Sequence, residues 1–235
     1  MKTLYRPDAS RIHRTDAWKT SAYAFVPYET HFGELCGFAD DVVAPGHGFG
    51  MHPHRDMEIS TLMLQGAQRH EDSTGTRHLL GTHAVQTMSA GSGIHHSERN
   101  ASTTEPFHSY QVWVYPRAAG GAPRWETFAY RPEDAANRFL LALSPDRRAG
   151  SALIGQDAFF SVAMLEKTAR VPYHLYGAGH GVYVHCASGE VRVAGQRLGP
   201  GDALGVWEAE SCEVEALADS RLVLVEVPMA RGVRS

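Results

Sequence analysis

The sequence has few cysteines, no long hydrophobic run and no cluster of basic residues. Cys36, Cys186 and Cys212 are odd in number, far apart in the chain and form no CxxC pair. This spacing excludes a disulfide framework or a zinc knuckle and favours reduced, buried thiols in a cytoplasmic protein. No apolar stretch approaches the roughly 18 residues of a membrane helix, and the first residues lack the apolar core of a signal peptide. We therefore expect no membrane partner.

The charge balance is close to even. Lys and Arg number 22 and Asp and Glu number 26, which gives a formal net charge of −4. Without a basic block, a surface that neutralises phosphates is not expected, so nucleic acid is excluded as a partner. Hydrophobic residues make up 43% and charged residues 20% of the 235 residues, a globular composition. A chain of this length buries enough surface to fold without a structural metal.

Helical periodicity is scarce and turn signals are dense. The chain has 23 Gly and 12 Pro, which separate short β-branched or aromatic runs. This pattern predicts an all-β protein built from a sandwich or barrel. The expected strands cover residues 23–26, 35–39, 59–64, 83–88, 109–115, 159–165, 182–186, 191–193, 212–216 and 222–227. Residues 132–139, with Pro at the start followed by acidic residues, predict a short helix.

A change of composition divides the chain. Residues 117–123 are small, Gly-rich and end in Pro, as in a linker. The segments on either side resemble each other faintly, since a strand, a tight turn and a returning strand recur in both. We expect two β-barrels in tandem, one over residues 1–122 and one over residues 123–235.

Histidine is unevenly distributed. Nine of the 14 histidines lie between His47 and His108, and only His174, His180 and His185 follow residue 120. Packing gives no reason to gather imidazoles in one part of a chain. The concentration therefore indicates metal chemistry in the first half.

Two pairs of metal-ligand residues have matched spacing. His52 and His54 stand two apart, so on an extended strand both imidazoles point to one face, and His96 and Glu98 do the same. Neighbouring strands lie about 4.8 Å apart, which brings the four side chains together inside a barrel. Three imidazoles and a carboxylate suit one divalent transition metal per chain: Fe, Mn, Co, Ni, Cu or Zn. Iron availability and dioxygen chemistry favour Fe(II).

The other histidines are weighed as ordinary surface or core residues. His95 has the opposite parity to His96 and is expected to point out of the barrel. No role is assigned to the remaining isolated imidazoles, namely His13, His31, His47, His78, His83, His108, His174, His180 and His185.

The motifs resemble a known superfamily. The spacing from Gly46 through His52, His54 and Glu58 to Gly66 is similar to the first metal motif of the cupins. More narrowly, three segments resemble the pirin family, and the likeness extends over nearly the whole chain to the bacterial pirin-like bicupins described as quercetin 2,3-dioxygenases. These segments are His52-Pro53-His54-Arg55, residues 68–75 (QRHEDSTG) and Gly93-Ile94-His95-His96-Ser97-Glu98, with residues 107–114 (FHSYQVWV) continuing the match.

The two levels of resemblance imply different fourth ligands. The general cupin pattern uses Glu58 with His52, His54 and His96, whereas the pirin pattern uses Glu98. Glu98 is preferred because the His-Ser-Glu match is narrower and parity pairs it with His96. Glu58 is then expected to orient an imidazole as a hydrogen-bond acceptor or to pair with Arg55.

The resemblance implies an activity. A small aromatic substrate such as a flavonol, or another phenol or enol, would react with O2, and Glu98 would act as general base. Gln111 is expected beside the site, with Phe49 and Met51 as apolar pocket walls. The resemblance also implies metal only in the first barrel. The second barrel offers Tyr173 and Leu175 where the first has His52 and His54, and is expected to close the pocket or support a homodimer, the alternative state being a monomer.

Two alternatives remain open. The chain could be a non-catalytic, iron-binding redox sensor or regulator, as implied for animal pirins; Glu58 and Gln111 beside the ligands favour an enzyme. A purely structural zinc is disfavoured because the chain is long enough to fold without one.

Overall fold

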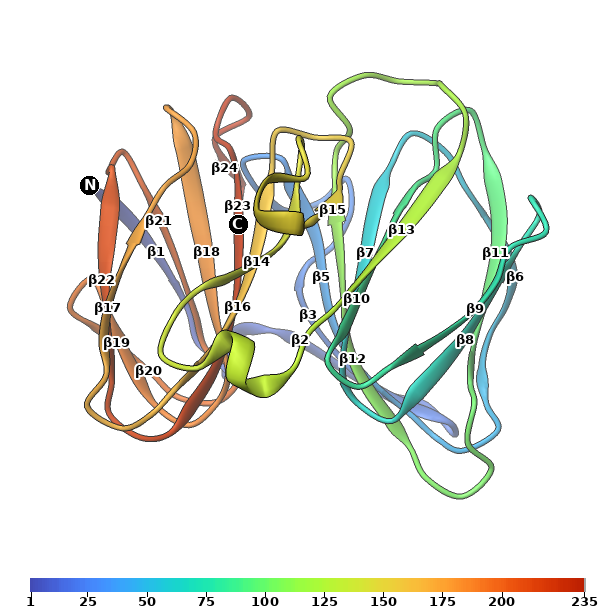
Figure 1. Ribbon diagram of the computed structural model, residues 1–235, viewed down its shortest axis with the longest axis horizontal. Helices are drawn as coiled ribbons and strands as arrows, with labels where there is room; N and C mark the ends of the chain where they lie inside the picture. Colours follow the sequence, from blue (N-terminus) through green and yellow to red (C-terminus); the bar gives the residue numbers. More distant parts are fainter. Residues whose placement is uncertain (235) are drawn as a thin grey trace.

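The computed structural model describes residues 1–234 and contains two β-barrels side by side (Figure 1). Each barrel pairs a large sheet with a four-stranded sheet. The large sheet has the strand order β13-β10-β7-β12-β5-β3-β2 in the first barrel and β1-β21-β18-β23-β16-β14-β15 in the second. The four-stranded sheets have the orders β6-β11-β8-β9 and β17-β22-β19-β20. The expected all-β architecture of two tandem barrels is confirmed.

The first barrel and its edge contain the strands β2 (Ile12–Thr15), β3 (Lys19–Phe25), β4 (His31–Phe32), β5 (Leu35–Val43), β6 (Gly48–His54), β7 (Glu58–Gln65), β8 (Ala67–Asp72), β9 (Arg77–Gly81), β10 (Ala84–Ser89), β11 (Ile94–Asn100), β12 (Phe107–Val114), β13 (Arg124–Ala129) and β24 (Val233–Arg234). The second contains β1 (Lys2–Arg6), β14 (Leu140–Ser144), β15 (Ala152–Leu153), β16 (Phe159–Leu165), β17 (Arg170–His174), β18 (His180–Ser188), β19 (Val191–Val193), β20 (Gln196–Leu198), β21 (Ala203–Trp207), β22 (Ser211–Ala216) and β23 (Ser220–Pro228). Three 3₁₀ segments connect them: η1 (Asp8–Ser10), η2 (Pro132–Ala135) and η3 (Arg148–Gly150).

Strands are exchanged across the expected boundary at residue 122. The N-terminal β1 pairs with β21 of the second barrel, and the C-terminal β24 pairs with β4 beside the first. Strand β13 follows the expected linker but pairs with β10 of the first barrel. The chain therefore passes between the barrels after β13, later than the Gly-rich segment, in the part of the chain that contains η2 (Figure 1).

The expected strands each fall within or overlap an observed one, and two of them, β16 and β19, match it residue for residue. The helix expected over residues 132–139 is wrong, because only the 3₁₀ turn η2 forms there. Asn137 adopts a left-handed φ of 52°, which a right-handed helix cannot continue.

One hydrophobic cluster contains residues of both barrels and joins them. Tyr183 of the second barrel is fully buried, and its ring centroid lies 5.1 Å from that of Phe25 and 5.7 Å from that of Phe38 in the first. A separate apolar cluster fills the inside of the second barrel with residues such as Val182, Val184 and Leu204. The inside of the first barrel instead includes buried polar side chains, namely Thr61, Gln68, His70, Gln86, His96 and Glu98. Since burying polar groups is costly, this contrast points to a site in the first barrel.

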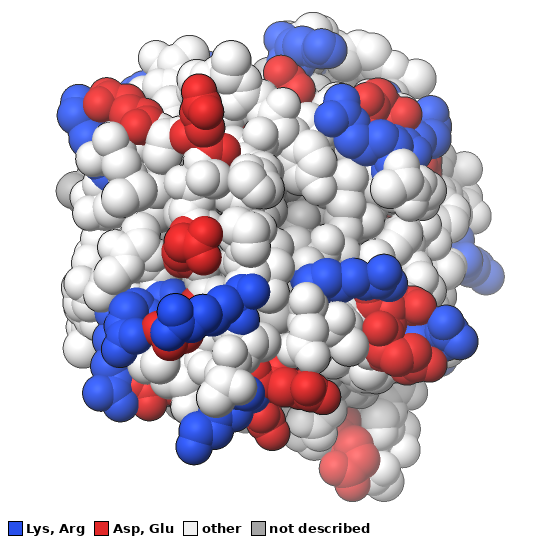
Figure 2. All heavy atoms as spheres, turned by 60° about the vertical axis from the view of Figure 1, so that its left-hand side comes forward, with Lys and Arg blue, Asp and Glu red and all other residues white. Residues whose placement is uncertain are grey.

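Acidic and basic side chains are interspersed on the face of the molecule seen in Figure 2. Among the residues that the structure describes, no helical segment has the length and apolar character needed to cross a bilayer.

Candidate metal centre

Three imidazoles converge where β6 and β11 pair. The strands are antiparallel neighbours, with His96 opposite His52. The ring centroids of His52 and His96 are 4.4 Å apart, and that of His54 lies 4.8 Å from each. One ring nitrogen of each residue lies within 4.8 Å of the other two. His95 is exposed and points away, as its parity predicts.

The backbone fixes the orientation of His52. Its Nδ1 lies 2.7 Å from the carbonyl oxygen of Gly50. A carbonyl accepts hydrogen bonds and cannot donate them, so Nδ1 carries the hydrogen and Nε2 keeps the lone pair of the neutral ring. This is the arrangement in which a histidine binds a metal through Nε2 while a main-chain group holds its other nitrogen.

His96 is the most buried of the three, with 1% of its surface exposed, and neither of its ring nitrogens has a hydrogen-bond partner within residues 1–234. A buried imidazole without partners is costly unless another group satisfies it. Burial, followed by the neighbouring imidazoles, lowers the pKa of His96 to about 3 and that of His54 to about 4. Both rings are thus neutral at pH 7, the form in which imidazole binds a metal. The donor set fits a transition-metal ion.

Glu98 lies next to the imidazoles. It is 3% exposed, and a carboxylate oxygen lies within 4.8 Å of ring nitrogens of His70 and His96. The side-chain amide of Gln68 donates to Oε1 at 2.7 Å, and that of Gln111 donates to Oε2 at 2.8 Å. Each oxygen of the carboxyl group thus accepts a hydrogen bond from a side-chain amide. The pairing with β6 shifts register between His96 and Glu98, so Glu98 lies opposite Phe49.

The structure adds His70, to which the sequence reasoning gave no role. His70 is fully buried on β8, opposite Glu98 on β11, with its ring centroid 5.1 Å from that of His96. The amide of Gln86 donates to its Nδ1 at 3.0 Å, which leaves the hydrogen on Nε2, 3.7 Å from Asp72. In this tautomer Nε2 has no lone pair for a metal and no hydrogen-bond partner within the described residues, although His70, His96 and Glu98 lie close enough together to form a second group of possible ligands. His70 stands two residues before Asp72 in the pirin-like hairpin, and this spacing is the sequence feature that could have pointed to it.

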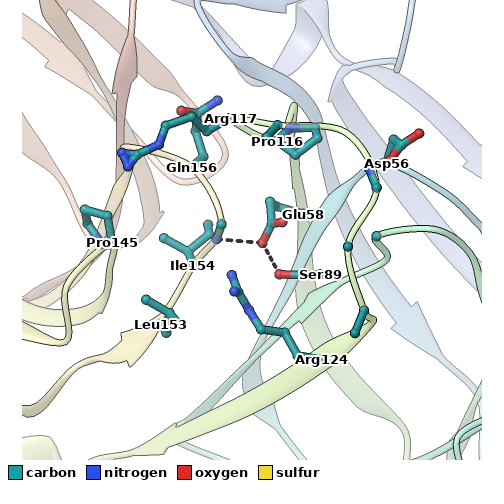
Figure 3. A pocket seen from close by; sticks show the side chains of 16 residues that line it. Asp56, Glu58, Ser89, Pro116, Arg117, Arg124, Pro145, Leu153, Ile154 and Gln156 are labelled. Atoms are coloured by element: carbon teal, nitrogen blue, oxygen red, sulfur yellow. Dashed lines mark hydrogen bonds between the residues drawn. The ribbon is translucent and has the colours of Figure 1, made fainter.

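Glu58 is not placed as expected. It opens β7 and turns away from the imidazoles, toward the second barrel. Its Oε2 accepts hydrogen bonds from Ser89 Oγ at 2.7 Å and from the backbone N–H of Gly155 at 2.8 Å (Figure 3). No imidazole and no Arg55 contact is among its bonds in residues 1–234, so the expected roles as imidazole acceptor or Arg55 partner are wrong.

A pocket of about 300 Å³ opens onto the cluster. Phe49 and Gln111 line it, as expected, whereas Met51 is 58% exposed and is not among the lining residues. The expectation that Met51 forms a wall is therefore wrong, because it points to the solvent side of β6. The remaining lining residues are Tyr23, Phe25, Pro27, Gly37, Phe38, Ala39, Asp41, His52, His54, Glu98 and Trp113. The lining combines aromatic rings with a few polar side chains, as in pockets that orient a small ligand.

The second barrel is arranged differently at the corresponding position. The hydroxyl of Tyr173 donates to buried Glu226 at 2.9 Å, and the same carboxylate accepts from the backbone N–H groups of Tyr176 and Gly177 and contacts Nδ1 of His180 at 2.9 Å. Each of these polar groups therefore has a hydrogen-bond partner within the set.

The chain matches two family models: Pirin over residues 7–114 and the quercetinase C-terminal cupin domain over residues 141–227. It is 38% identical over 216 residues to a quercetin 2,3-dioxygenase of Escherichia coli (strain K12), with 91% of each chain covered. It is 36% identical over 201 residues to a pirin-like protein of Caulobacter vibrioides, covering 85% of this chain and 86% of that one.

Solved structures agree with this assignment. The crystal structure of YhhW from Escherichia coli superposes with a TM-score of 0.90 at 34% identity, covering 97% of this chain and 98% of that one. A structure described as bacterial pirin YhhW in complex with nickel(II) has a TM-score of 0.90 at 33% identity, covering 97% and 99%. The two family matches and these full-length similarities show that the chain belongs to the pirin family of two-barrel cupin proteins.

Proposed function

We propose that this protein is a metal-dependent dioxygenase of the pirin type that cleaves a quercetin-like flavonol, or another phenol or enol, with O2. The observation that carries the proposal is the cluster of His52, His54 and His96, with the carboxylate of Glu98 next to His96, beside a pocket that His52, His54 and Glu98 line. Relatives named quercetin 2,3-dioxygenase support the substrate class.

We propose His52, His54, His96 and Glu98 as the ligands of one divalent ion in the first barrel, with Fe(II) as the native metal. Borderline nitrogen donors and one hard oxygen donor suit Fe(II), and they also admit Zn, Cu, Mn, Co or Ni. The unpartnered ring nitrogens of His96 support this assignment. When bound, the ion would supply Lewis acidity and electron exchange with dioxygen.

The residues around the ion would prepare the substrate. Glu98 can accept the proton of a substrate hydroxyl as general base, since its carboxylate lines the pocket. Gln111 holds that carboxylate at 2.8 Å from the pocket side. The rings of Phe49 and Trp113 would pack on the faces of a planar substrate and exclude water from the reacting carbon atoms.

The free thiols are in keeping with a cytoplasmic location, which we propose on that ground. Cys36, Cys186 and Cys212 are all buried and unpaired within the described chain. Burial raises the pKa of each thiol to about 12, so the reactive thiolate is disfavoured.

The test is the loss of flavonol absorbance in air, measured with iron-loaded wild-type protein and with a His96→Ala variant. We expect rapid loss for wild type and at least a roughly hundredfold slower loss for the variant, because a metal-dependent step needs every ligand. His95→Ala is the matched control, since His95 is the exposed neighbour on the same strand. Equal rates for wild type and His96→Ala would overturn the proposal. Iron binding without turnover of any phenol or enol would favour the regulatory alternative.

A further inference from the structure

A second cavity, of about 570 Å³, lies between the two barrels (Figure 3). One wall comes from the start of β7 and the end of β10, another from the chain between β12 and β13, and a third from the chain around β15. The residues proposed as metal ligands do not line it. The cavity is therefore separate from the pocket of the metal centre, although Asp56 and Glu58 at its edge follow His54 closely in the chain.

Two guanidinium groups reach this cavity without partners. Arg117 and Arg124 both line it, and neither side chain makes a hydrogen bond or ion pair with any residue from 1 to 234. In Figure 3 Arg117 lies at the top of the view, whereas the side chain of Arg124 reaches up from below toward Glu58. The nearest acidic side chain on the strand of Arg124 is Glu126, which is already engaged by Arg147. Arg124 interacts electrostatically with the nearby carboxylate of Glu58, but the N–H groups of both guanidinium groups remain available to hydrogen-bond a ligand.

The acidic side chains of the cavity are already hydrogen-bonded. Asp56 accepts at Oδ1 from the backbone N–H of Gly120 at 2.6 Å. Glu58, 4% exposed, accepts at Oε2 from Ser89 and Gly155. Burial raises the pKa of Glu58, with Ser89, Gly155 and Arg124 acting in the opposite direction. The two carboxylates formally balance the charge of Arg117 and Arg124, but the guanidinium N–H groups are the donors of the cavity that lack hydrogen-bond partners within the described chain.

Glu58 nevertheless has one free oxygen. Its Oε1 makes no hydrogen bond within the described chain, while Oε2 makes two. Gly155 permits this arrangement, because a Cβ at residue 155 would stand 2.3 Å from Oε1 of Glu58 and 2.9 Å from a guanidinium nitrogen of Arg124. The bare backbone thus leaves room for a carboxyl oxygen and a guanidinium group side by side at the cavity wall.

We propose that this cavity is a binding site for a small hydroxy-dicarboxylate. Arg117 and Arg124 would each pair with one carboxylate of the ligand, since the planar guanidinium matches a carboxylate with two parallel hydrogen bonds. The free Oε1 of Glu58, which stands near the guanidinium group of Arg124 at the cavity wall, would bond the ligand hydroxyl. The volume lies within the range that holds a small organic molecule.

The test is calorimetric titration of the purified full-length protein with L-malate at low salt. We expect measurable binding, at least a roughly tenfold loss of affinity for the Arg117→Gln/Arg124→Gln variant, and weakening by added salt because both groups are exposed. The matched control is Arg69→Gln/Arg77→Gln, which removes the same charge from exposed residues of β8 and β9. It should bind malate like wild type.

Two further titrations locate the ligand. Succinate lacks the hydroxyl group and should bind wild type more weakly than malate. In the Glu58→Gln variant, the ratio of the malate affinity to the succinate affinity should differ from that of wild type. His96→Ala should bind malate as wild type does. Absence of binding at about 10 mM malate, undiminished binding by the Arg117/Arg124 double variant, or loss of binding in His96→Ala would each overturn the proposal; the last would place the ligand at the metal centre.

Discussion

Gln111 donates a hydrogen bond of 2.8 Å from its side-chain amide to Oε2 of Glu98. The indole N–H of Trp113 in turn donates to Oε1 of Gln111 at 2.9 Å. An indole nitrogen can only donate, so the amide oxygen must face Trp113 and the NH₂ group must face Glu98. The carboxylate that we propose as ligand and base is thus held from the pocket side by an amide of fixed orientation.

Replacing Gln111 by Leu should slow flavonol turnover while the metal stays bound. A hydrogen bond to a charged group contributes about 1.5–3 kcal/mol, which corresponds to a roughly 10- to 150-fold change in rate if it acts in the transition state. Turnover and metal content are measured on the same preparation. Gln65→Leu, at the exposed end of β7, is the control. An unchanged rate in Gln111→Leu would show that the amide does not position the base.

The two glutamates should differ in their effect on metal content. Glu98→Gln removes a proposed ligand and should weaken metal binding at least about tenfold, whereas Glu58→Gln changes a side chain that faces the other cavity and should leave most of the metal bound. Metal analysis after gel filtration decides between them. The opposite result would assign the fourth position to Glu58, as in the general cupin pattern.

Gly155→Ala should destabilise the protein. Its Cβ would approach Oε1 of Glu58 to 2.3 Å, so the buried carboxyl group must move and weaken its hydrogen bonds with Ser89 and the backbone, at a cost of about 1–3 kcal/mol. Gly81→Ala is the matched control, because its Cβ would meet nothing within 4 Å. Urea unfolding measures both variants. Equal stabilities would mean that the contact between Gly155 and Glu58 is loose.

Stability should fall on acidification through His185. This imidazole is fully buried between the rings of Phe38 and Tyr110, each with its centroid at 4.9 Å, and burial lowers its pKa to about 3. The unfolded chain binds a proton near pH 6.5, whereas the folded protein does not until about pH 3. The contribution of His185 is therefore complete above pH 6.5 and is lost at up to about 1.4 kcal/mol per pH unit as the pH falls toward 3.

Urea unfolding between pH 7.5 and pH 5 measures this effect. The His185→Phe variant should lose part of the pH dependence of wild type, while the exposed His174→Gln should keep it. Parallel curves for wild type and His185→Phe would contradict the assignment.

Local sequence pattern was sufficient for the strands and for most of the imidazole cluster. Parity within a strand fixes which side chains share a face, so His52 with His54, and the outward direction of His95, followed from spacing alone. Parity does not carry across a break in the strand. Glu58 is separated from His54 by a turn in which Asp56 takes a left-handed φ of 50°, and this turn sends Glu58 to the other cavity.

Long-range pairing could not be predicted from local pattern. The pairing of β1 with β21 joins residues about 200 positions apart, and nothing in either segment encodes its partner. His70 was missed for a similar reason, because only the pairing of β8 with β11 brings it opposite Glu98. The cavity between the barrels is formed by segments of both barrels, so no single segment of the sequence could predict that Arg117 and Arg124 line it.

The central claim is that one metal ion is held by His52, His54, His96 and Glu98. Anomalous scattering measured at the iron edge from crystals of the iron-loaded protein tests it most directly. We predict a single peak per chain, at coordination distance from those four side chains (about 2.0–2.2 Å for the imidazole nitrogens). A peak that His52 and His54 do not reach, a second peak in the other barrel, or no peak at all would contradict the account.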